Sequence, residues 1–279
     1  HFYIGSNPNA DTIDPNVYGA TLLTPLALSA VLFLRSSSIV TKALWLVVVA
    51  LFFSAMLVSA SRGAIIAAVA MAIFLAMRSR FRGQFFAIVP LAAIAIMASP
   101  VASRFAEGDV STGNGRIEIW KVGLASLRQY WLGGAGIGNF PDAFAQYFLA
   151  VPHVVLPWDR VAHSVFVQSI VEYGVIGSVL VLAVWYYVFR ELAQVSASDR
   201  IVDICTALRA GVVGLFVAGF SLDLMMYKYT WLTFSLIALM RSSLVTSGVP
   251  LSFSYGTHEK QKAKSSAVPV RGPEILPEV

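Results

Sequence analysis

Long apolar stretches separated by short polar turns are the feature that most limits how this chain can fold. A helix needs about 17–25 apolar residues to cross the hydrocarbon core of a bilayer. Only 13% of the residues are charged and 57% are hydrophobic, whereas soluble domains carry about 25% charged residues. The sequence therefore predicts an all-α, polytopic transmembrane bundle of about seven spans, namely Val17–Leu34, Ala43–Ala60, Gly63–Met77, Phe85–Val101, Ser164–Phe189, Cys205–Leu222 and Met226–Leu244.

The charged residues are divided unevenly between the two sides of this predicted bundle. One side holds thirteen basic and six acidic residues, and the other holds seven basic and eight acidic residues. Cytoplasmic loops carry the excess of lysine and arginine in membrane proteins. We therefore expect the N-terminal segment and a long loop, 102–162, to lie outside the cytoplasm and the C-terminus to lie inside. The net charge of +5 then reflects orientation and predicts no nucleic-acid partner.

The chain is predicted to form one membrane domain, 1–251, followed by a disordered cytoplasmic tail, 252–279. The tail is polar and contains proline and the basic run KQKAK, a composition that cannot bury a core. The first residue is His1 and the opening segment is rich in turn residues, so we expect further spans to precede it in a longer chain. The single cysteine, Cys205, excludes an intramolecular disulfide and a cysteine-based metal cluster.

The loop 102–162 is long enough to carry function rather than only to connect two spans. Apolar residues recur in it at helical spacing and predict an amphipathic helix on the membrane surface, with a stripe formed by Ile117, Trp120, Leu124 and Leu127. The segment LGGAGIGNF follows, and its glycines permit tight turns or close backbone approach by a ligand. We expect short helices in this extracytoplasmic loop.

Three residues on the predicted outer face suggest chemistry. Arg62 lies at the outer end of the second predicted span, Arg116 begins the surface helix, and His163 begins the helix that leaves the loop. Arginine offers forked donors that match phosphate oxygens, and a neutral histidine can take a proton from a hydroxyl near pH 7. Together they form a plausible metal-free transferase site for a lipid-linked pyrophosphate. Arginines at helix ends are also common membrane anchors, and a histidine at a helix start is often a cap or a surface residue.

Glu172 is unusual because a carboxyl group deep in a predicted span is costly and needs a partner. A structural hydrogen bond or ion pair is the first interpretation, and a substrate-gating role is the second. The tryptophans of the loop, Trp120, Trp131 and Trp158, have two interpretations as well, because they can stack on sugars or anchor the loop in the membrane interface.

The order of several short motifs, from about Asp14 to Phe234, resembles the O-antigen ligase and O-antigen polymerase family. No single motif is strong, but their order, spacing and side of the membrane agree. They are DPN (Asp14, Pro15, Asn16), SRG (61–63), GR–x3–W (115–120), the glycine-rich segment and H–x8–E–x–G–x2–G (163–177).

The resemblance implies a metal-independent, inverting transferase of the bacterial inner membrane that needs no cofactor. Its donor would be a glycan on undecaprenyl pyrophosphate, and its acceptor a hydroxyl of the lipid A core, of another glycan or of a protein. The resemblance assigns Arg62 and Arg116 to the pyrophosphate and His163 to the general base. We also assign a smaller set of residues to substrate binding, namely Asp14, Asn16, Trp120, Arg160 and Glu172.

Two other classes of protein compete with an enzyme. A polysaccharide transporter or lipid flippase would place polar or broken-helix elements near the bilayer midplane, whereas the polar groups here gather at the outer mouth, apart from Glu172 and Pro90. A membrane scaffold gives no reason for the placement of Arg62, Arg116 and His163.

Overall fold

The computed structural model of the protein describes residues 14–99, 102–103, 115–151, 160–193, 195 and 197–249. Within these ranges the chain forms helices and no strand, which confirms the predicted helical class. The predicted tail 252–279 and the segment before Asp14 lie outside the described residues.

Each of the seven apolar stretches coincides with a helix, the first with two helices in succession. These are α1 (Pro15–Thr21), α2 (Leu23–Arg35), α3 (Ile39–Val58), α4 (Arg62–Arg78), α5 (Arg82–Met97), α10 (Val165–Glu191), α11 (Asp199–Ala218) and α12 (Lys228–Thr246). Four of the described helices are long and apolar enough to cross a membrane, namely Pro15–Arg35, Ile39–Val58, Val165–Glu191 and Asp199–Ala218. Crossing by α4, α5 and α12 stays a prediction, and α5 is a shorter apolar helix that contains Pro90.

Helix α11 lies at the centre of the bundle and packs most extensively against α4 and α2. Small residues on α11 permit this close approach, as is usual where helices pack in membranes. A Cβ atom at Gly211 would lie 2.6 Å from Oγ1 of Thr24 on α2, so this glycine is needed for the contact. In contrast, Met56 is the only buried residue of α3, and α3 and α5 present large apolar side chains outward as a lipid-facing helix does.

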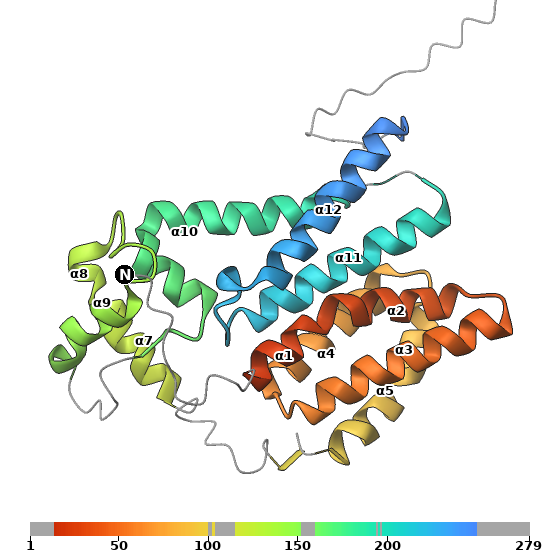
Figure 1. Cartoon of the computed structure of the whole chain (residues 1–279), viewed down its shortest axis with the longest axis horizontal. Coiled ribbons are helices and arrows are strands. Elements are labelled where there is room, and N and C mark those ends of the chain that lie inside the picture. Colours follow the sequence, from red (N-terminus) through yellow and green to blue (C-terminus); the bar gives the residue numbers. More distant parts are fainter. Residues whose placement is uncertain are drawn as a thin grey trace, which may run out of the picture.

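The predicted loop forms a compact helical unit with its own core. It contains α7 (Arg116–Ala125), α8 (Leu127–Tyr130), α9 (Phe140–Tyr147) and the 3-10 turn η2 (Phe148–Ala150). Phe140 and Phe144 are fully buried in this core, to which α10 contributes Val171. Figure 1 shows α7, α8 and α9 gathered at one end of α10, away from α3 and α5. We call this the loop-bearing end of the molecule.

The amphipathic helix predicted for the loop is present as two pieces, α7 and α8, separated at Ser126. The side of α7 that packs into the core of the unit is formed by Ile119 and Val122, which are almost completely buried. The predicted stripe is instead partly exposed, because α7 packs against α9 and α10 rather than lying free. Contact between that stripe and the membrane surface stays a prediction.

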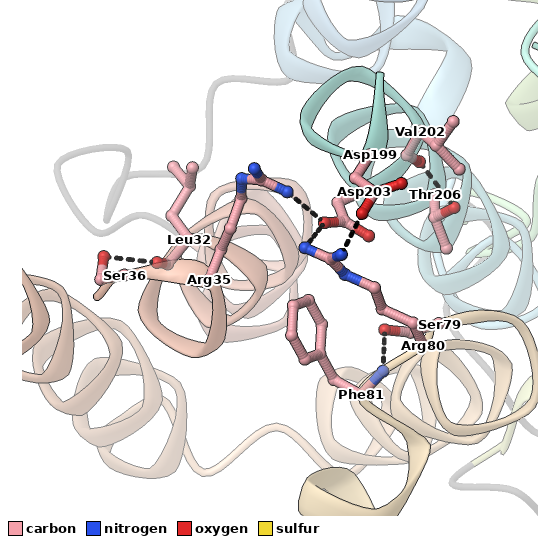
Figure 2. A network of polar contacts seen from close by, with 10 residues as sticks. All are labelled: Leu32, Arg35, Ser36, Ser79, Arg80, Phe81, Asp199, Val202, Asp203 and Thr206. Atoms are coloured by element: carbon pink, nitrogen blue, oxygen red, sulfur yellow. Dashed lines mark hydrogen bonds and ion pairs between the residues drawn. The ribbon is translucent and has the colours of Figure 1, made fainter. Parts of the chain in front are cut away.

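The opposite end of the bundle is held by a network of ion pairs (Figure 2). Asp203 of α11 accepts one hydrogen bond from Arg35 at the end of α2 (2.7 Å) and forms an ion pair with Arg80 in the α4–α5 turn (3.0 Å). Arg80 also pairs with Asp199, and Arg241 of α12 pairs with Glu191 at the end of α10. At the end away from the loop unit, these contacts join α2 and the α4–α5 turn to α11, and α12 to α10.

Candidate functional site

The DPN and SRG motifs, although 45 residues apart, are joined by direct hydrogen bonds. Oδ1 of Asp14 accepts from the backbone N–H of Asn16 (2.8 Å) and from its side-chain amide (3.0 Å). The hydroxyl of Ser61 then donates to Oδ1 of Asn16 (2.8 Å). Asn16, which we predicted to bind substrate, thus has its side chain engaged in holding these two segments together.

The SRG turn places Arg62 as the first residue of α4. Ser61 caps the helix by accepting a hydrogen bond from the N–H of Ala64 (3.1 Å). A Cβ atom at Gly63 would lie 2.6 Å from the hydroxyl oxygen of Ser221, so a larger residue here would require that hydroxyl to move. Ala60, just before the motif, has a φ of 52°, a left-handed conformation that costs energy for any residue with a side chain.

Arg116 likewise begins a helix, because the GR–x3–W motif forms the first turns of α7. Gly115 takes a φ of 79° and redirects the chain into the helix. Trp120 lies one turn further along the same side of the helix, and its Nε1–H donates to the carbonyl oxygen of Ala162 (2.8 Å). This contact ties the loop arginine to the residue that precedes His163.

His163 lies at the start of α10 with a φ of 47°, in the left-handed region. The backbone is held on both sides of it: Ala162 is fully buried, and the N–H of Val165 donates to the carbonyl oxygens of Gly219 and Leu222 (2.9 and 3.0 Å). Strained conformations of this kind persist only where surrounding contacts enforce them, and they are frequent at functional sites.

Electrostatic effects show that the predicted site residues lie within reach of one another. Burial lowers the pKa of Arg116, and the positive charge of Arg62 lowers it further while Asp14 opposes the change. Burial also lowers the pKa of His163, with Arg116 and Arg160 acting in the same direction and Asp14 against it. Arg62, Arg116, Arg160, His163 and Asp14 therefore form one cluster at the loop-bearing end. The lowered pKa of His163 favours the neutral form of its imidazole.

The glycine-rich segment approaches the backbone of α10 rather than an open surface. Helix α10 is broken at Gly174, whose φ and ψ are 65° and −168°. The N–H groups of Ala135 and Gly136 donate to the carbonyl oxygens of Val171 and Glu172 (2.8 and 2.9 Å). A Cβ atom at Gly134 would lie 2.2 Å from the carbonyl oxygen of Glu172, so the close approach predicted for a ligand is used by α10 itself.

Glu172 makes the structural hydrogen bonds that were its first interpretation. Its Oε1 accepts from the backbone N–H of Phe140, at the start of α9 (3.3 Å), and from the side-chain amide of Gln168 (3.1 Å). The side chain is 1% exposed. Glu172 therefore links α10 to α9, and its role in substrate gating stays a prediction. Trp120, through its contact with Ala162, also has a structural role in the loop.

Two residues adjoining the cluster were not singled out in the sequence. Burial raises the pKa of Asp223, after α11, to about 7, and the charge of Glu172 acts in the same direction. Tyr227, which precedes α12, lies within electrostatic reach of Asp14 and Asp223. Both residues lie in a short turn far along the chain from the motifs. A polar turn between two apolar helices was their only signal.

The helices and the site define a class of protein, namely multi-pass helical membrane proteins with a basic cluster at one end. The family model described as O-Antigen ligase matches residues 46–182, a range that includes Arg62, Arg116 and His163. The chain belongs to this family. The family and the four candidate spans together indicate a glycan transferase in the inner membrane. No curated protein matches the chain.

Proposed function

We propose that this protein transfers a glycan from an undecaprenyl-pyrophosphate carrier to a hydroxyl acceptor at the outer face of the inner membrane. The observation that carries the proposal is the cluster itself. Arg62, Arg116 and His163 come from three separate segments of the chain, and Arg116 lies within electrostatic reach of both Arg62 and His163. Their order and chemistry are those of a site that binds a phosphorylated leaving group beside a base.

The pyrophosphate would lie against the arginines. Arg62 and Arg116 are the first residues of α4 and α7, so the positive ends of both helix dipoles add to their charge. Within the part of the chain that the structure describes, neither arginine forms an ion pair with a carboxylate. Charge that builds up on the departing pyrophosphate would be offset by these groups.

His163 would act as the general base. As the acceptor hydroxyl attacks C1 of the sugar, its oxygen forms the new glycosidic bond and its proton passes to the imidazole. The C1–oxygen bond to the pyrophosphate breaks with its electron pair going to the phosphate oxygen, and the configuration at C1 inverts. The lowered pKa of His163 supports this role, because the neutral form predominates at pH 7.

The proposed orientation places the loop-bearing end in the periplasm and the C-terminus in the cytoplasm. The ion-paired end carries many of the basic residues, as cytoplasmic ends do. No nucleotide is available on the outer side, so the donor must already be activated, and a polyprenyl pyrophosphate meets this need.

The transporter alternative draws on the break in α10, because broken helices form ion and substrate sites in transporters. Here the freed carbonyl oxygens of Val171 and Glu172 are satisfied by backbone N–H groups of the glycine-rich segment. The break therefore attaches the loop unit to α10 and leaves neither of these carbonyl oxygens free for an ion or a substrate. This favours the transferase over the transporter.

The test is glycan transfer by His163→Ala and His163→Asn in membranes supplied with lipid-linked glycan. Asparagine tolerates the left-handed conformation, so His163→Asn separates loss of the base from backbone strain. We expect both variants to reach wild-type levels in the membrane and to lose transfer. Normal transfer by His163→Asn would exclude the base role, and loss of activity with a chelator would contradict the metal-independent mechanism.

The acceptor can be identified from a deletion strain. Accumulation of single lipid-linked repeat units would indicate a polymerase. Accumulation of polymer on its carrier would indicate a ligase.

A further inference from the structure

The turn after α8 is fastened to α10 at the level where α10 is broken. The N–H of Val175 donates to the carbonyl oxygen of Trp131 (2.8 Å), and the N–H of Ile176 donates to that of Leu132 (3.4 Å). These bonds place Trp131 and Leu132 beside the first turn of α10 that follows Gly174.

The side chains of this turn are apolar and exposed. Trp131 is 57% exposed, Leu132 is 49% exposed, and Ile137, in the glycine-rich segment, is 73% exposed. The adjoining part of α10 presents an outward apolar row formed by Val175, Ile176, Val179 and Leu180. The loop residues therefore extend the apolar surface of a helix that is long and apolar enough to cross the membrane.

The lengths indicate where this surface meets the edge of the bilayer. From Val175 to Glu191, α10 has a rise of about 25 Å at 1.5 Å per residue, close to the hydrocarbon thickness of about 30 Å. Because Glu191 pairs with Arg241 at the opposite end, Val175 lies near the other boundary. This is the depth at which tryptophan is enriched in membrane proteins.

We propose that Trp131, Leu132 and Ile137 form a bilayer anchor that rests the loop unit on the outer leaflet. These three side chains continue the outward apolar face of α10, which would face lipid in the membrane. We therefore identify lipid as what covers them. Trp120, whose N–H is bonded to Ala162, belongs to the site, whereas Trp131 belongs to the interface.

The anchor and the site belong to one packed unit, since the core of that unit joins α7, α9 and the first half of α10. The anchor therefore sets the height of Arg116 and His163 above the lipid head groups. A pyrophosphate attached to a membrane lipid has little freedom in height, so this distance determines whether it reaches the arginines.

The test uses spin labels on the full chain in nanodiscs of phosphatidylethanolamine and phosphatidylglycerol. In a Cys205→Ser background, single cysteines replace Leu132 or Ile137. Val179→Cys, on the outward face of α10, is the bilayer reference, and Lys121→Cys, exposed on α7, is the water reference. We expect labels at 132 and 137 to collide with oxygen as often as the label at 179. We also expect several-fold fewer collisions with a water-soluble nickel chelate than at 121.

Nickel collisions equal to those at 121 would overturn the anchor. Strong dipolar coupling between labels on two chains would also overturn it, because the patch would then be covered by a second copy. Neither readout depends on enzymatic activity, so the outcome is independent of the proposed function.

Discussion

Arginines at the two ends of this bundle have different surroundings. At the end away from the loop unit, Arg35 and Arg80 share Asp203, and Figure 2 shows their side chains converging on it. At the loop-bearing end, Arg62 and Arg116 are close enough that Arg62 lowers the pKa of Arg116. Among the described residues, neither of these two has a carboxylate ion pair.

The difference separates arginines that are ion-paired within the fold from arginines that, under the proposed function, bind an anion. Partly buried positive charges that repel each other reduce stability unless a ligand of opposite charge binds between them. The strained backbone at Ala60 and His163 lies at the same end. Under the proposed function, the loop-bearing end therefore serves binding and the opposite end serves cohesion.

The largest expected effect is loss of transfer when an arginine of the cluster is removed. Arg116→Ala and Arg62→Ala should each reduce the transfer rate by about 10²–10³-fold, because each removes a preorganised donor to the leaving group. Transfer is measured in membranes with equal amounts of protein. Arg128→Ala, at an exposed arginine of α8, is the matched control and should retain activity. Equal losses of transfer in all three variants would mean that the arginines of the cluster have no specific role in transfer.

The second effect is stabilisation by inorganic pyrophosphate. A ligand at 100 times its Kd stabilises the folded state by about 2.7 kcal/mol, so pyrophosphate should raise the Tm of the detergent-solubilised protein by several degrees. The shift should disappear in Arg62→Ala. An undiminished shift in that variant would show that the anion binds elsewhere.

The third effect concerns the opposite end. Asp203→Asn should lower stability by about 2 kcal/mol, because the buried carboxylate holds one arginine from α2 and one from the α4–α5 turn. Thermal unfolding measures the loss, and transfer per folded molecule should be unchanged. Arg200→Gln, at an exposed arginine on the same helix, should leave the Tm as it is. If Asp203→Asn lost transfer but not stability, the ion-paired end would take part in transfer rather than in stabilising the fold.

The smallest effect is on the pH profile. Arg160 contributes to lowering the pKa of His163, so Arg160→Gln should raise that pKa toward its ordinary value of 6.5. The imidazole must be neutral to accept a proton, and activity falls as pH decreases through its pKa. The acid limb of the kcat profile should therefore move to higher pH. If the acid limb does not move, the group that titrates there is not His163.

Much of the bundle and part of the site were predictable. Apolar length located every helix of the bundle, and short motifs singled out Arg62, Arg116 and His163. The insertion of the glycine-rich segment into the break of α10 was not predictable, because a glycine-rich run is equally compatible with a ligand loop. Asp223 and Tyr227 were missed because no local pattern relates the α11–α12 turn to residues two hundred positions earlier.

The sequence by itself determined that the chain is a helical membrane protein, where its helices lie and which polar residues deserve attention. Hydrophobic length and charge are local properties, so they can be read along the chain. Only the tertiary structure decided that Ser61 bonds to Asn16, that Trp120 holds the residue before His163 and that Glu172 caps α9. These contacts depend on distances across the packed bundle, which the spacing of residues along the chain does not contain.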